Sequence, residues 1–304
     1  MNKGLRFLLQ GVVIALLGFG SWKSYELYQQ HKIVKNERKK TALLEEKPFV
    51  VIIPSYNNSP YCEKNVSSVL TQNYKNFRVI YIDDASNDDT GLKVEKIVAA
   101  SPLKEKVCII HNEQNKGALA NLYDAIHTCK KEEIIVTVDG DDFLAHEQVL
   151  TKLNKVYSTT PTWMTYGNFL NYPSYTQKPV ACKPFPKTVI FNNSFRTHEW
   201  VSSHLRTFYA GLFQLVHKED LLYQGKFLPM GWDLAMMLPM LEMSGKHTYF
   251  IHDILYLYNR TNPLNDHKVN LSLQSACADH VKNLPKYKRI KALPFETTSK
   301  EHSL

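Results

Sequence analysis

Apolar and polar residues alternate along the chain in blocks that predict strands followed by helices. The first block, FVVIIP at 49–54, is a continuous apolar run typical of a strand buried on both faces of a parallel sheet. The same alternation predicts, in chain order, a helix at about 60–72, a strand at 77–83, a helix from near Asp88, a strand at 107–110, a helix from 116 to about 130 and a strand at 133–139. Four such alternations predict an α/β fold with a mostly parallel, Rossmann-like sheet flanked by helices.

The pattern is less regular after residue 157. A strand is predicted at 162–170, and the Pro- and Asn-rich stretch 173–194 is predicted to be a long loop. A helix-like run begins directly after Asp233, and the last strand-like run ends near Arg260.

The amino terminus contains an apolar run, Phe7 to Trp22, preceded by Lys3 and Arg6. As a helix, these residues would be about 24 Å long, somewhat less than the roughly 30 Å of a bilayer core, so flanking residues must help to span it. A signal peptide is the alternative, but no cleavage site of the A-x-A type follows the run. We therefore expect residues 1–22 to be a retained membrane anchor.

Charge divides the 304 residues further. Residues 1–47 carry nine Lys and Arg against four Asp and Glu, and residues 281–304 carry six against two, which leaves 48–280 close to neutral. We therefore predict a basic stalk at 23–47, a catalytic domain at 48–280 and a basic tail at 281–304, and no nucleic acid as a partner. The cations after the anchor favour a cytoplasmic catalytic domain, with a lumenal orientation in the Golgi or ER as the alternative.

Polar residues follow three of the predicted strands, at the edge of the sheet where ligands bind in such folds. The densest group is Asp139-Gly140-Asp141-Asp142. Three carboxylates so close together repel one another unless a cation or solvent compensates. Oxygen ligands on a loop suit Mn²⁺ or Mg²⁺, which also bind phosphate oxygens. This loop therefore predicts a divalent metal beside a diphosphate, and a metal-free acidic turn is the alternative.

Four segments, VVIIPSYN, IDDASNDDT, NKGALANLYDAI and VTVDGDDFL, occur here in an order and spacing that resemble the family 2 glycosyltransferases of the GT-A fold. The resemblance extends over about 49–157. It implies an enzyme that transfers a sugar from a nucleotide-sugar donor, such as a UDP-sugar, to a saccharide or glycolipid acceptor.

The resemblance also implies roles for single residues. Asp141 corresponds to the metal ligand of the family. The positions that match the nucleotide-sugar pocket are Pro54, Tyr56, Asp83, Asp84, Gly117, Asn121, Asp139 and Gly140.

If the sugar is transferred with inversion at its anomeric carbon, the enzyme needs a carboxylate that takes the proton of the acceptor hydroxyl, on the side away from the metal. Asp233 is the candidate for this base, although Trp232-Asp233 stands where the family often has Glu-Asp, and a helix N-cap is the alternative role. Further residues predicted to lie on the acceptor or diphosphate side are Asp142, His204, Arg206, Trp232, Tyr258 and Arg260.

Two other functions fit parts of the pattern. A nucleotidyltransferase would need a basic, Gly-rich loop directly after the first strand, and residues 54–60 contain none. A catalytically silent, membrane-tethered protein that binds sugars or partners would not need Asp139, Asp141 and Asp233 together.

Overall fold

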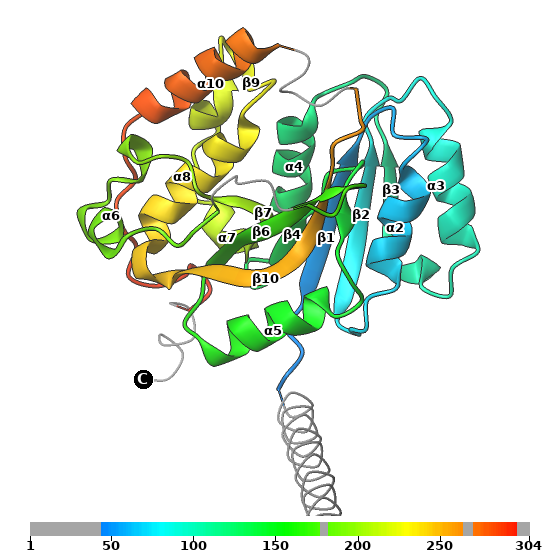
Figure 1. Ribbon diagram of the computed structural model, residues 1–304, viewed down its shortest axis with the longest axis horizontal. Coiled ribbons are helices and arrows are strands. Elements are labelled where there is room, and N and C mark those ends of the chain that lie inside the picture. The colour runs from blue at the N-terminus through cyan, green and yellow to red at the C-terminus, as the bar shows by residue number, and fades with distance from the viewer. Residues whose placement is uncertain (1–43, 177–181, 264–269, 297–304) are drawn as a thin grey trace, which may run out of the picture. The chain divides into compact units, whose positions relative to one another are not determined.

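A single eight-stranded sheet is the centre of the computed structural model, which describes residues 44–176, 182–263 and 270–296 (Figure 1). Its strand order is β3-β2-β1-β4-β7-β6-β10-β5. The first four strands are parallel to one another: β1 (Phe49–Ser55), β2 (Phe77–Asp83), β3 (Val107–His111) and β4 (Ile134–Thr137). The order 3-2-1-4 places the carboxyl ends of β1 and β4 side by side, at the position where ligands bind in such sheets.

The second half of the chain extends this sheet with both strand directions. β7 (Ser203–Tyr209) runs antiparallel to β4 and to β6 (Met164–Tyr172), whereas β10 (Thr248–Asn259) runs parallel to β6. The short β5 (Phe143–Leu144) closes the edge antiparallel to β10. A separate hairpin is formed by β8 (Leu222–Tyr223) and β9 (Lys226–Phe227). The predicted α/β fold with a mostly parallel sheet is confirmed.

Helices flank the sheet (Figure 1). In chain order they are α2 (Cys62–Leu70), α3 (Thr90–Ala99), α4 (Ala118–His127), α5 (Val149–Thr159), α6 (Lys187–Asn192), α7 (Ala210–Phe213), α8 (Trp232–Ser244) and α10 (Leu271–Asn283). Four single 3₁₀ turns are η1 (Lys104–Lys106), η2 (Phe195–Thr197), η3 (Lys218–Leu221) and η4 (Gly245–His247). α2 packs beside α3, while α4 packs on β1 and against α7.

The helix α8 is buried along nearly its whole length, from Leu234 to Ser244. Its sequence is apolar on all sides, which is typical of a helix enclosed by other elements. The one acidic side chain in this buried stretch, Glu242, accepts hydrogen bonds from Arg196 Nε and Nη2 at 2.7 and 2.9 Å. Asp233 lies in the first turn of the same helix and is partly buried. The packing of α8 therefore fixes the position of Asp233.

The structure differs from the sequence expectations in two segments of the second half. The predicted loop 173–194 contains α6, and the segment with His204 and Arg206 is strand β7 in the middle of the sheet. β7 carries polar residues because one of its ends borders a cleft, and this breaks the apolar pattern of a buried strand.

The predicted anchor at 1–22 and the stalk up to residue 43 lie outside the described residues. Within the part of the chain that is described, no helix has both the length and the apolar character needed to cross a bilayer. The compact unit that holds the sheet starts at Glu46, and α10 runs across the predicted boundary at residue 280.

Candidate active site

A cleft of about 530 Å³ opens where β1 and β4 end. One wall comes from the first half of the chain, with Pro54, Tyr56 and the loop after β4. The other wall comes from β7, the start of α8 and the end of β10. The volume falls in the range of small-molecule sites, about 300–1,000 Å³. Eleven of the predicted site residues line the cleft: Pro54, Tyr56, Asp139, Gly140, Asp141, His204, Arg206, Trp232, Asp233, Tyr258 and Arg260.

The loop after β4 is held close to the end of β1. Gly140 N donates to Pro54 O at 3.1 Å, and a Cβ atom at Gly140 would lie 2.5 Å from Ser55 Oγ. A larger residue would therefore push the loop away from β1. Asn65 Nδ2 holds the loop from below by donating to Asp139 O at 2.9 Å. This packing places the carboxylates of Asp139 and Asp141 on the cleft.

Asp142 lies beneath the cleft and does not line it. Its side chain is fully buried, and Oδ1 accepts a 2.6 Å hydrogen bond from Asn259 N. Burial, together with the neighbouring carboxylates of Asp141 and Asp139, raises the pKa of Asp142 well above its ordinary value. Asp142 is therefore a buried acid that supports the loop, whereas the sequence had placed it on the acceptor or diphosphate side.

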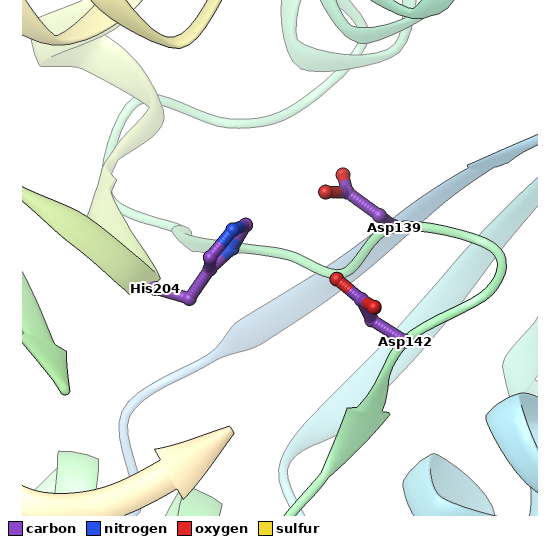
Figure 2. A group of neighbouring side chains, drawn as sticks. All are labelled: Asp139, Asp142 and His204. Atoms are coloured by element: carbon purple, nitrogen blue, oxygen red, sulfur yellow. The ribbon is translucent and has the colours of Figure 1, made fainter. Parts of the chain in front are cut away.

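Three side chains converge next to this loop: Asp139, Asp142 and His204 (Figure 2). One potential ligand atom from each lies within 4.8 Å of the others. The imidazole of His204 stacks on Tyr256 with ring centroids 4.3 Å apart, and burial and Arg206 hold its pKa well below the usual value. His204 is therefore neutral at physiological pH, which is the form that can bind a metal.

The chemistry of these donors fits a divalent cation. Oδ2 of Asp142 and Nδ1 of His204 are buried and have no hydrogen-bond partner among the described residues. The carboxylates of Asp139 and Asp141 add oxygen donors on the cleft side, the ligand type that Mn²⁺ and Mg²⁺ bind. Asp141, the ligand expected from the sequence, is not among the three converging residues; its Oδ2 accepts a 2.7 Å hydrogen bond from Asn262 Nδ2.

Asp233 lies on the wall of the cleft formed by the second half of the chain. α8 begins after Gly231, which has φ +64° and occupies the N-cap position, so Asp233 lies in the first turn and makes no cap hydrogen bond. Arg206 Nη2 is 3.3 Å from Asp233 Oδ2 and 3.4 Å from His204 Nε2. The guanidinium of Arg206 also lies over the ring of Trp232, 5.3 Å from its centroid.

Arg206 is 5% exposed, and its Nε and Nη1 have no hydrogen-bond partner within the described part of the chain. A buried guanidinium with unused donors beside a cleft is suited to an anionic group.

Four predicted nucleotide-site residues do not line the cleft: Asp83, Asp84, Gly117 and Asn121. Asp84 accepts hydrogen bonds from Lys116 N at 2.9 Å and Gly117 N at 2.8 Å, while Asp83 accepts from Ser86 N at 3.2 Å. These carboxylates fix the loops that follow β2 and β3. Gly117 has φ +84°, a conformation that favours glycine, and directly precedes α4, whose first residue, Ala118, reaches the cleft.

The sequence did not identify several residues of the site, and three of them lie at or near the Asp139–Asp141 loop. Asn262 donates to Asp141, Asn58 lines the cleft, and the hydroxyl of Tyr256 accepts from Asp139 N at 3.1 Å. Tyr256 could have been found, because it alternates with Tyr258 at the end of a strand. The sequence gives no local signal for Asn262, since its contact with Asp141 depends on the fold.

This geometry agrees with the comparison to protein families. The family model for "Glycosyl transferase family 2" matches residues 50–215, more than half of the chain. The chain belongs to glycosyl transferase family 2. The expected enzyme class, a glycosyltransferase, is thereby confirmed, and the cleft described above is its candidate active site.

Two relatives of this family 2 glycosyltransferase come from bacteria. Glycosyltransferase GlyG of Streptococcus pneumoniae is 26% identical over 69% of this chain and 70% of its own length. The Escherichia coli protein named UDP-Glc:alpha-D-GlcNAc-diphosphoundecaprenol beta-1,3-glucosyltransferase WfgD is 28% identical over 47% of this chain and 53% of its own length.

Among solved structures, S. aureus TarS 1-349 is similar with a TM-score of 0.55 and 18% identity, over 70% of this chain and 60% of TarS. At this identity the likeness concerns the fold, and it supports the GT-A architecture. The chain spans little more than half the length of WfgD and of this part of TarS.

Proposed function

We propose that this glycosyltransferase moves a sugar from a UDP-sugar donor to a saccharide or glycolipid acceptor, with inversion at the anomeric carbon and with a bound Mn²⁺ or Mg²⁺. The observation that carries the proposal is the set of carboxylates in the cleft: Asp139 and Asp141 come from the loop after β4, and Asp233 comes from the start of α8. Inversion requires the acceptor to attack from the face opposite the leaving diphosphate. The base and the diphosphate site must therefore lie on different sides of the sugar.

In this proposal Asp233 removes the proton of the acceptor hydroxyl as that oxygen attacks the anomeric carbon. Arg206, within 3.3 Å, orients the Asp233 carboxylate. The side chain of Trp232, which also lines the cleft, covers Arg206 and limits the access of water to the pair. Tyr256 and Asn262 keep the Asp139–Asp141 loop in place through their hydrogen bonds to Asp139 N and Asp141 Oδ2.

Asp141 and Asp139 would hold the divalent ion, with His204 and Asp142 next to them. When bound, such an ion neutralises the charge that develops on a leaving diphosphate. The choice of Asp141 as principal ligand rests on its place on the cleft, where a diphosphate can approach it.

UDP as the nucleotide is supported by one relative and by one solved structure of similar fold. WfgD is named as an enzyme that uses UDP-Glc and a diphosphoundecaprenol-linked acceptor, and TarS has been solved with UDP-GlcNAc. A thermal-shift screen with Mn²⁺ tests the choice of donor. We expect a UDP-sugar to raise the melting temperature and GDP-mannose to leave it unchanged, and the reverse order would contradict the proposal.

We further infer that residues 1–22 anchor the enzyme with its catalytic domain in the cytoplasm, from the apolar run and the six Lys and Arg between Lys23 and Lys40. Protease treatment of sealed inside-out vesicles tests this orientation. The catalytic domain should be digested without detergent. Protection until detergent is added would contradict the cytoplasmic orientation.

A further inference from the structure

One surface of the domain combines an exposed aromatic residue with exposed cations. We define the basic face as α6, η4 and the segment 286–291. Phe191, the fifth residue of α6, is 82% exposed, the highest value among the large apolar side chains described as exposed. Six cationic side chains of the basic face are exposed: Lys187, Lys246, Lys286, Lys288, Arg289 and Lys291.

The three segments of the basic face are in direct contact. Arg289 Nη2 donates to Phe191 O at 3.2 Å, and Asn193 Nδ2, at the end of α6, donates to Tyr287 O at 3.0 Å. The side chain of Arg289 also packs on Gly245, the first residue of η4. In Figure 1 the segment after α10 passes alongside α6. Phe191 and the cations therefore belong to one continuous surface.

The cations of this face are not neutralised within the protein. In the described ranges, none of the six cationic side chains forms an ion pair with a carboxylate. By contrast, the exposed Lys93, Lys116 and Lys152 elsewhere on the domain each contact an Asp. The positive charge of the basic face is thus available to an outside partner.

We propose that the basic face docks on the surface of an anionic phospholipid bilayer, with Phe191 inserted at the level of the headgroups. Lys and Arg are attracted to anionic headgroups, and an aromatic ring among them is favoured at the boundary between headgroups and acyl chains. A single-stranded nucleic acid would instead require several aromatic side chains along a groove. Phe191 is the large aromatic residue with high exposure on this face, and it stands on a single short helix.

The proposal does not depend on the identity of the donor or acceptor. Docking would hold the catalytic domain directly on the bilayer, so a glycolipid headgroup would need to move little to reach the cleft. It concerns a second membrane contact, separate from the predicted anchor at 1–22.

Tryptophan fluorescence of the full-length protein tests the contact at one position. The Phe191→Trp variant should fold normally, because the site is exposed. Vesicles of brominated phosphatidylglycerol should quench its tryptophan fluorescence more than they quench that of the parent protein. Leu92→Trp is the matched control, because Leu92 is 63% exposed on α3 and lies outside the basic face. We expect no added quenching for Leu92→Trp.

Charge reversal supplies the second measurement, in the Phe191→Trp background. Replacing Lys286, Lys288 and Lys291 by Glu should lower the vesicle affinity measured by this quenching at least about tenfold. The reason is that each cation near such a surface raises the affinity by about fivefold. The control replaces two exposed lysines outside the basic face, Lys96 on α3 and Lys104 in η1, by Glu and should leave the quenching unchanged. Three results would overturn the proposal. The first is no quenching of the Trp at position 191, and the second is equal quenching by vesicles of brominated phosphatidylcholine. The third is release of the protein from vesicles by an equimolar amount of a short single-stranded DNA.

Discussion

Asp141 shows how a single carboxylate depends on its neighbours. It is placed on the cleft by the glycine at 140, which fits against Ser55, and its Oδ2 is held by Asn262. A divalent ion at such a site is bound jointly by carboxylate and diphosphate oxygens, so that metal and UDP stabilise each other's binding.

We therefore expect Asp141→Asn to weaken UDP binding in the presence of Mn²⁺ by about 10- to 100-fold. The amide can keep the contact with Asn262 but loses the negative charge. Isothermal calorimetry with and without EDTA measures the coupling. Asp124→Asn, at an exposed residue of α4 paired with Lys116, is the matched control and should bind UDP normally. UDP affinity that is unchanged both by EDTA and by Asp141→Asn would remove the metal from the account.

The residues that the sequence could identify are those with a chemical signature of their own. Asp139, Asp141 and Asp233 line the cleft as expected, because closely spaced carboxylates and a carboxylate at a helix start stand out locally. Asp84 was expected to contact the nucleotide, yet its carboxylate binds the backbone of Lys116 and Gly117. Both uses need a buried Asp after a strand, so the sequence alone does not separate them.

At the scale of elements, α8 connects the site to the rest of the second half. The carboxylate of Glu242 binds the guanidinium of Arg196 in η2, and it also accepts a 2.9 Å hydrogen bond from Tyr287 N. Arg196 Nη1 donates a further hydrogen bond to Val281 O of α10. Both side chains of the ion pair are nearly inaccessible, at 2% and 0% exposure. Removing one partner of such a pair leaves a buried charge, which costs about 3–5 kcal/mol.

Glu242→Gln should therefore lower the free energy of unfolding by about 3 kcal/mol or more, because it leaves the guanidinium of Arg196 uncompensated. Urea denaturation followed by circular dichroism measures this. Asp253→Asn, which removes the exposed pair with Lys152, is the matched control and should cost under about 1 kcal/mol. Equal effects of the two substitutions would show that the Arg196–Glu242 pair does not hold α8.

The helices and strands of the first half were predictable because, within each of them, apolar residues follow the spacing typical of that one type of element. β2 coincides with the predicted strand 77–83, and α4 lies within the predicted helix. β7 was missed because its polar residues face the cleft, and α6 was missed because it has only six residues, too few to show a helical period.

At the scale of the whole molecule, the cleft is lined by two halves of the chain, and the sequence predicts the structure of the first half better than that of the second. Residues 50–215 carry the family pattern, and the wall with Trp232 and Asp233 lies beyond it. Two strand pairings bring the halves together: β5 with β10, and β4 with β7, which places Arg206 opposite Thr137. No local sequence signal specifies these pairings, so the relation of Asp233 to Asp141 could not be read from the sequence.

The account assigns the metal and diphosphate to one wall and proton transfer to the other. The structure disfavours a helix-capping role for Asp233, because Gly231 occupies the cap position and Asp233 makes no cap hydrogen bond. A stabilising interaction with the helix dipole remains, worth about 0.3–1 kcal/mol. General-base catalysis contributes far more to the rate, about 10² to 10⁴.

Turnover of Asp233→Asn is thus the most direct measurement. The variant should melt within a few degrees of the parent, bind UDP with Mn²⁺ equally well, and lose at least about a hundredfold in the rate of sugar transfer from the donor selected by the screen. Asn keeps the size and the contact with Arg206 but cannot accept the proton. Transfer at close to the parental rate by a correctly folded Asp233→Asn protein would contradict the assignment of Asp233 as the base.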